Sequence, residues 1–472
     1  MENTRTGLRE IRRRDFLKLG GLAVAGSAMS PLLSSCGLFG DASSSGGDLS
    51  GTTLALATVS NSQMEDMRSL TSHFTDKTGI KVEYQFLPEN TLRQRVTQDV
   101  AMQSGNYDIV TIGSYDTPIW GQYEWIVPLD QYFSQMSQSE KDEYDRGDLL
   151  ESILSVLSYD DQLFALPFYG ESSMLFYRQD LFDQAGLQMP DKPKWDQVTD
   201  FAKSLQESGT DASSIVLRGL PGWGANMAPF GTFLNTFGGR WYNPDWEPQL
   251  NSSAVKEAIQ AYSTLGREYA QSGITSHNFP ECQNIFASGD GAMWYDATSA
   301  AGYISDPETS SVADTLGYAY GPTAVTPRGA HWLWSWALAI ESSSRKKEAA
   351  FEFIKWATSK EYIELVNNEL GQVRIPPGTR QSTYQSTPYK DNPWSDIELD
   401  SINTANPDRP TEKPVPYTGI QYVAIPEFQQ MGDSVGRSLA SVLSGGMSVD
   451  QMSRKAQQEA LQVAKQGEYL KK

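Results

Sequence analysis

Strand-like and helix-like hydrophobic patterns alternate along the first third of the chain. Residues 53–57 alternate toward a strand, and residues 62–79 place apolar side chains on one face of a helix. A second strand is expected at 81–86, a second helix at 91–104, and a third, largely apolar strand at 107–113. Strand, helix, strand, helix, strand in this order predicts a parallel α/β sheet.

Polar loops follow the first and third of these strands. Asn61 and Gln63 come directly after the first strand, and Tyr115 comes directly after the third. In open parallel sheets, ligands bind beyond the carboxyl ends of the strands. We therefore expect Asn61, Gln63 and Tyr115 at a binding edge, with ordinary turn and helix-cap chemistry as the alternative for each residue.

The pattern changes at residue 166. Pro167 lacks the N–H that an interior strand needs, so Leu166-Pro167-Phe168 is expected to close an extended segment. Residues 169–173, which include Glu171, form a polar turn in this interpretation, and residues 174–177 form a short buried strand. We expect the chain to pass here from one domain to another.

Aromatic residues mark two later segments. The loop 222–227 carries Trp223 between two glycines, which would let an aromatic side chain approach a ligand, and Asn226 follows in the same loop. Residues 316–322 are expected to form a second crossing between domains. After it come three tryptophans in alternation, Trp332, Trp334 and Trp336. Three indoles on one face exceed what a routine core strand needs, although core packing is the alternative for any one of them.

The charge and the cysteines exclude several classes of protein. Residues 36–472 carry a net charge of −23, because the first 35 residues hold six of the 38 Lys and Arg and three of the 58 Asp and Glu. Such a chain repels nucleic acid and anionic lipid. Cys36 and Cys282 are its two cysteines, so a disulfide framework is not expected, and the three histidines are too dispersed for a metal site. A chain of this length is expected to form two domains.

The first residues look like an address for export. Arg13 and Arg14 stand in a twin-arginine export pattern, and residues 19–33 form a weakly apolar run that is too short to span a membrane. Leu33-Ser34-Ser35-Cys36 resembles a lipobox, in which Cys36 is lipidated and becomes the first residue of the mature chain. A plain exported protein is the alternative. Residues 37–51 are a Ser/Gly-rich, flexible tether.

Several motifs together resemble a known family. Tyr177-Arg178-Gln179-Asp180-Leu181, followed by Pro193 and Trp195, resembles the bacterial extracellular solute-binding proteins of ABC importers, family 1. The resemblance covers nearly the whole chain after residue 50. The segments Phe-Tyr-Gly-Glu-Ser-Ser from 168, Trp-Tyr-Asp-Ala-Thr from 294 and Trp-Leu-Trp-Ser-Trp-Ala-Leu-Ala-Ile from 332 resemble the branch that binds sugar alcohols such as mannitol and sorbitol.

The resemblance implies an α/β fold of the periplasmic-binding-protein type, similar to type II, with a ligand cleft between two lobes and about three crossings. We expect lobe 1 to comprise residues 52–165 and 318–365, and lobe 2 to comprise residues 166–317 and 366–472. It also implies that the aromatic and the polar residue after Ala292-Met293, namely Trp294 and Asp296, line the cleft.

The residue types in this set suit a ligand with many hydroxyls. Carboxylates accept hydrogen bonds from hydroxyls, an arginine donates them and offsets buried negative charge, and indoles offer flat faces to C–H edges. A turn or cap role is the alternative for Glu171, a bond within one lobe for Asp296, and a surface ion pair for Arg374. The full set expected to bind the ligand is Asn61, Gln63, Tyr115, Glu171, Trp223, Asn226, Trp294, Asp296, Trp334, Trp336 and Arg374.

The expected function is capture of a sugar alcohol outside the cytoplasm and its delivery to an ABC permease, by a monomer anchored through Cys36, without a cofactor, a metal or an enzymatic activity. A monosaccharide or short oligosaccharide is the alternative ligand. An exported carbohydrate hydrolase would need Glu171 and Asp296 held ~5–9.5 Å apart, and the chain carries no other catalytic motif. A surface adhesion or sensor lipoprotein is a third reading.

Overall fold

The computed structural model describes residues 49–470. The export signal with Cys36, and all but the last residues of the predicted tether, lie outside the described residues. The first sheet has the strand order β2-β1-β3-β10-β6, in which the first three strands run parallel and β10 runs antiparallel to both of its neighbours. Its strands are β1 (Thr53–Val59), β2 (Lys81–Leu87), β3 (Ile109–Gly113), β6 (Leu166–Glu171) and β10 (Trp334–Ile340).

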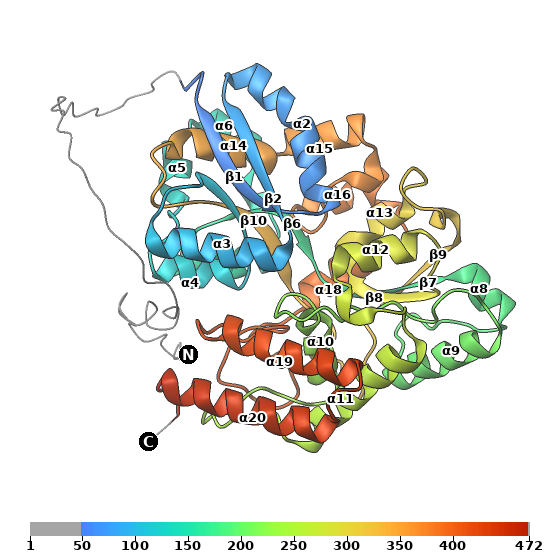
Figure 1. Ribbon diagram of the computed structural model, residues 1–472. Helices are drawn as coiled ribbons and strands as arrows, with labels where there is room; N and C mark the ends of the chain where they lie inside the picture. The colour runs from blue at the N-terminus through green and yellow to red at the C-terminus, as the bar shows by residue number, and fades with distance from the viewer. Residues whose placement is uncertain (1–48, 471–472) are drawn as a thin grey trace, which may run out of the picture. The chain divides into compact units, whose positions relative to one another are not determined.

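Helices cover this sheet to form the first lobe (Figure 1). The helix predicted at 62–79 buries Met64, Met67 and Phe74, so the apolar spacing was a correct guide to its buried face. The helices of this lobe are α2 (Ser62–Thr78), α3 (Glu89–Met102), α4 (Asp116–Gln122), α5 (Asp130–Gln135), α6 (Gln138–Tyr144), α7 (Glu151–Val156), α14 (Lys347–Ala357) and α15 (Lys360–Glu369).

The second lobe is built on a smaller antiparallel sheet with the order β8-β7-β9, made of β7 (Ser173–Arg178), β8 (Met293–Ala297) and β9 (Leu316–Tyr320). The C-terminal helices α19 and α20 pack against α10 and α11 at the bottom of Figure 1. The helices of this lobe are α8 (Gln179–Gln184), α9 (Trp195–Glu207), α10 (Met227–Thr236), α11 (Ser253–Thr264), α12 (Phe279–Ala287), α13 (Ala301–Ser305), α19 (Phe428–Leu443) and α20 (Val449–Gln466).

The first crossing between the sheets lies later than predicted. Glu171 pairs with Trp334 in the first sheet and Ser173 pairs with Ala297 in the second, so the chain changes sheets at Ser172 and not at 166. No turn forms at 169–173. Pro167 is tolerated because β6 is an edge strand, whose outer side needs no N–H donor.

The other two crossings also refine the predicted boundaries. β9 belongs to the second sheet through residue 320, so lobe 1 resumes with β10 and not at 318. The third passage follows α15 and runs through α16 (Gln381–Gln385), α17 (Thr387–Lys390) and α18 (Ser395–Thr404), of which α18 contacts strands of both sheets. Across residues 49–470, the helices are all too short or too polar to cross a bilayer.

Candidate functional site

A cavity of about 270 Å³ lies where the two lobes meet. This volume is just below the ~300–1,000 Å³ that ligand pockets typically enclose, which suits a small ligand. Its walls combine indoles with charged groups from both lobes. Its lining includes Asn61, Glu89, Arg93, Tyr169, Glu171, Arg218, Trp223, Gly224, Asn278, Glu281, Trp332, Trp334 and Trp336.

Arg93, on the first turns of α3, is surrounded by three of these indoles. Its guanidinium carbon lies 3.9 Å from the ring centre of Trp223 and 4.9 Å from those of Trp334 and Trp336. Its Nη2 donates to Glu89 at 2.8 Å, and its Nη1 lies 3.4 Å from Asp116. These contacts hold the cation and the three rings as one wall of the cavity.

Two glycines make this wall possible. A Cβ on Gly113, at the end of β3, would overlap the indole of Trp334. A Cβ on Gly224 would overlap the Glu89 carboxylate and crowd Arg93. Close approach of Trp223 and its loop to α3 therefore depends on the missing side chain at 224.

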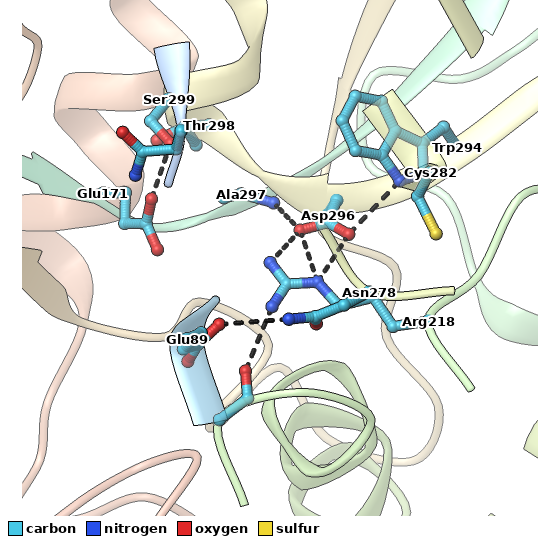
Figure 2. A network of polar contacts seen from close by, with 12 residues as sticks. Glu89, Glu171, Arg218, Asn278, Cys282, Trp294, Asp296, Ala297, Thr298 and Ser299 are labelled. Carbon is cyan, nitrogen blue, oxygen red and sulfur yellow. Dashed lines mark hydrogen bonds and ion pairs between the residues drawn. The ribbon is translucent and has the colours of Figure 1, made fainter. Parts of the chain in front are cut away.

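Arg218 provides the second buried cation of the cavity, and Asp296 on β8 fixes its position (Figure 2). Arg218 Nε donates to Asp296 Oδ2 at 2.9 Å, and its Nη1 donates to the carbonyl of Gly224 at 3.1 Å. Asp296 also accepts from Trp294 Nε1 at 3.2 Å and from the backbone N–H of Ala297 at 2.7 Å. Asp296 is thus saturated within its own lobe.

Glu171 is the last residue of β6 and faces the cavity from the crossing point. Ser299 Oγ of the second lobe donates to its Oε2 at 2.5 Å. Burial raises the pKa of Glu171 to about 8, although the Ser299 hydrogen bond and the charge of Arg218 lower it in part. Among residues 49–470, no lysine or arginine forms an ion pair with this carboxyl group.

Five of the predicted site residues line the cavity: Asn61, Glu171, Trp223, Trp334 and Trp336. Asn61 has two roles, because its Oδ1 caps α2 at the backbone N–H of Met64 and its Nδ2 donates to Tyr169 Oη at 2.8 Å. The capping alternative was therefore true of this residue without removing it from the cavity. Trp334 and Trp336 come from β10, whereas Trp332, the third indole of the predicted strand, precedes that strand.

Four predicted residues lie behind the cavity wall and not on it. Tyr115 packs its ring 4.7 Å from that of Trp223 and donates from Oη to the carbonyl of Ile425. Asn226 is fully buried and donates to the carbonyl of Gly436. Trp294 and Asp296 are also fully buried. These four side chains support the groups that line the cavity.

The remaining two predicted residues, Gln63 and Arg374, lie in a second interlobe region that we name the Arg374 contact. Arg374 donates to Asp66 of α2 at 2.7 and 3.0 Å, and its Nη1 lies 3.5 Å from Asp306 of the second lobe. Gln63 Nε2 donates to the carbonyl of Ser299 at 2.9 Å. The hollow here measures only about 10 Å³, about the space that one water occupies.

Glu398 of α18 completes the Arg374 contact. It is fully buried, and its Oε2 accepts from Tyr389 at 2.6 Å and Tyr384 at 2.9 Å. Burial raises the pKa of Glu398 to about 7 against the lowering effect of these two hydroxyls. This carboxyl group is enclosed by protein, whereas Glu171 faces open volume.

The sequence interpretation missed Glu89, Arg93, Arg218 and Asn278. Asn278 Nδ2 donates to Glu89 Oε2 at 3.2 Å and so joins the two lobes at the cavity (Figure 2). Glu89 and Arg93 stand four residues apart and share a face of α3, but the helix was predicted to begin at 91, so this pairing was not recognised. Arg218 lies in a loop joined to the second lobe by isolated bridges, and no local pattern marks it.

Comparison with known proteins places the chain beside binding proteins of bacterial importers. The family model described as "Bacterial extracellular solute-binding protein" matches residues 61–364. A protein named mannitol-binding protein, from Pseudomonas aeruginosa, is 43% identical over 420 residues, which is 89% of this chain and 94% of that protein.

Solved structures agree in fold. An ABC transporter solute-binding protein from Agrobacterium vitis with bound D-mannitol is 44% identical, with a TM-score of 0.85 over 88% of this chain and 99% of that one. A second, from Agrobacterium radiobacter in complex with ribitol, is 25% identical, with a TM-score of 0.77 over 88% of this chain and all of that one.

Proposed function

Because the chain belongs to the family of bacterial extracellular solute-binding proteins, we propose that it is the binding component of an ABC importer and captures a linear sugar alcohol. The ligand, of the mannitol or sorbitol kind, occupies the cavity between the lobes and is passed to a membrane permease. The observation that carries this proposal is the wall itself, in which indoles, guanidinium groups and a carboxyl group hydrogen-bonded to Ser299 face one small volume.

The wall offers what each part of a sugar alcohol requires. Faces of Trp223, Trp334 and Trp336 suit the C–H edges of the carbon chain. Glu171 and Asn61 supply acceptors and a donor for hydroxyls, and Arg218 supplies donors from the opposite lobe. Hydrogen bonds that involve a charged group contribute ~1.5–3 kcal/mol each, so a few of them suffice for tight capture.

Hydrolysis is not part of the proposal. A glycosidase would need two carboxyl groups free to act on the same bond. Asp296 is fully buried and bound by Arg218, Trp294 and the backbone N–H of Ala297. The second carboxyl group of the postulated pair is therefore occupied. A monosaccharide remains the second candidate ligand, because the aromatic faces suit a sugar ring as well as an open chain.

We place the protein at the outer face of the cell membrane. The twin arginines and the lipobox of the first 36 residues support export and lipidation of Cys36. Replacement of Cys36 by Ala should release the protein from membranes and leave the ligand affinity of the soluble form unchanged. If the variant stays with the membrane fraction in high salt, the anchor is a different one.

Titration calorimetry of residues 49–472 against mannitol, sorbitol, arabitol, common hexoses and maltose tests the ligand class. A sugar alcohol should bind more tightly than any hexose or disaccharide and should raise the unfolding free energy by ~2.7 kcal/mol at 100 times its Kd. The proposal would be refuted if no sugar alcohol bound measurably while a disaccharide did. It would also be refuted by any chemical change in the ligand.

A further inference from the structure

Acidic residues outnumber basic residues on the cavity wall, and both arginines of the wall already form ion pairs within the protein. Three acidic residues and two arginines line the cavity, namely Glu89, Glu171, Glu281, Arg93 and Arg218, and no lysine or histidine is found among the described lining residues. The side chains of both arginines are 6% exposed, so neither is free to swing into solvent.

Each arginine has its own carboxylate partners behind the wall. Arg93 is held by Glu89 and Asp116, and Arg218 is held by Asp296, which is completely buried. With these partners included, the acids outnumber the bases. An anionic ligand would therefore find both guanidinium groups already paired with carboxylates, so that the described lining offers it no unpaired cation.

Glu171 is a cavity carboxyl group that forms no ion pair with a lysine or arginine among residues 49–470. Its hydrogen-bond partner is the neutral hydroxyl of Ser299, and Figure 2 shows it apart from the Arg218–Asp296 pair. A ligand that brings a positive charge would supply the partner this carboxyl group lacks.

We propose that the cavity selects its ligands by charge, accepting sugar alcohols and their protonated amino derivatives while excluding sugar acids and sugar-alcohol phosphates. This inference rests on the proposed function, since it concerns the same cavity. An ammonium in place of one terminal hydroxyl keeps the donor and the size of the ligand and adds the missing cation. A carboxylate at the same position adds a further negative charge to an acidic wall.

The burial of Glu171 is consistent with this selection. Burial raises the pKa of its carboxyl group to about 8, so the group is mostly neutral in the ligand-free protein at neutral pH. Glu89, Asp296, Tyr169 and Arg218 are the charged or titratable groups nearest to it. An ammonium beside Glu171 favours its ionised form, because an opposite charge at short range lowers the pKa of a carboxyl group.

The test uses three ligands of one shape: D-mannitol, the amino alditol in which an ammonium replaces one terminal hydroxyl, and D-mannonate. Mannitol reads the same from both ends, so either terminal position gives the same derivative. Calorimetry at pH 8 should give the amino alditol an affinity within about tenfold of mannitol or better, and mannonate an affinity at least ~100-fold weaker.

Glu171→Gln isolates the carboxyl group as the cause. In this variant the ratio of amino-alditol affinity to mannitol affinity should fall about tenfold, and the ratio of mannonate affinity to mannitol affinity should rise. A purely structural disturbance would change all three affinities together and leave the ratios in place. Glu143→Gln, which removes the same charge from the exposed face of α6, is the matched control and should leave both ratios within about twofold. If Glu171→Gln does not fold, Glu89→Gln replaces it as the test variant, because it also removes a carboxylate from the cavity wall.

The outcomes separate this inference from the function beneath it. Tight mannitol binding together with equally tight mannonate binding, or with an amino alditol bound ~100-fold more weakly, overturns the charge selection and leaves the function standing. Unchanged ratios in Glu171→Gln overturn the role of this residue. A protein that binds none of the three overturns both.

Discussion

The cavity and the Arg374 contact both join the lobes, and both set an arginine between two carboxylates. In the cavity, Arg93 is covered by three indoles beside about 270 Å³ of open volume. In the Arg374 contact, the arginine bridges Asp66 and Asp306 with about 10 Å³ left beside it. The same residue types therefore hold the lobes together in one place and build a wall for a ligand in the other. What separates the two is the space and the aromatic surface around the ion pair.

The largest effect is expected from breaking the pair that serves the cavity wall. Arg218→Met should lower the unfolding free energy by ~3–5 kcal/mol, because Asp296 is fully buried and would lose its cation. Chemical denaturation measures this change. The double variant with Asp296→Asn should recover part of the loss, since it removes the orphaned charge. A loss below about 1 kcal/mol in the single variant would contradict the assigned role of the pair.

The next effect concerns ligand affinity. Trp223→Leu keeps an apolar side chain but removes the ring that covers Arg93 at 3.9 Å. The ring is also proposed to pack against the C–H edge of the ligand and to hold Arg93 in the wall, so mannitol affinity should fall roughly tenfold. Trp246→Leu, at a tryptophan outside the cavity lining that stacks on Tyr469, is the control and should leave affinity unchanged. Calorimetry of both variants gives the comparison.

In the Arg374 contact, a substitution is expected to lower stability modestly and to leave ligand affinity nearly unchanged. Arg374→Gln should lower the unfolding free energy by ~1–3 kcal/mol, because its partners are partly shielded from solvent. Mannitol affinity should change less than about threefold, since the side chain does not line the cavity. A loss of affinity as large as that of Trp223→Leu would mean that the two regions act as one.

The subtlest expected effect is a change in pH dependence. The pKa of Glu398 is raised from 4.5 to about 7, so the native state holds its proton in a range where the unfolded chain has released it. The free energy of unfolding should therefore fall as pH rises through this range. Glu398→Gln removes that fall and should leave mannitol affinity unaltered. Denaturation at pH 5, 6, 7 and 8 measures the slope, and an identical slope in variant and parent would show that Glu398 titrates normally.

The first lobe was predictable because its signals are local. The spacing of Met64, Met67 and Phe74 fixes a helix face, and the apolar run before Gly113 predicts a strand buried among others. The error at 166 came from treating Pro167 as a strand terminator. Proline excludes an interior strand, and whether a strand lies at the edge of a sheet depends on its distant neighbours.

The candidate site was only half predictable for the same reason. Trp334 and Trp336 carry their signal in their own alternation, and both line the cavity. Asp296 and Arg218 are 78 residues apart, and nothing in either segment of the sequence shows that the two side chains form an ion pair. Arg374 sits in a similar setting and was assigned to the ligand because a lone arginine in a turn shows no partner in the sequence.

Glu171 lines the cavity and also stands next to Ser172, where the chain passes from one sheet to the other. The strand before Ser172 belongs to the first sheet and the strand after it to the second, so a rotation of one lobe against the other would change the backbone at this junction, as at the other two crossings. The carboxyl group that touches the cavity sits on that junction. A change in the contact between the ligand and Glu171 therefore acts directly on a backbone segment that joins the two lobes. Fluorescent dyes attached to α6 of the first lobe and α20 of the second lobe would report a rotation between the lobes as a change in energy transfer between the dyes.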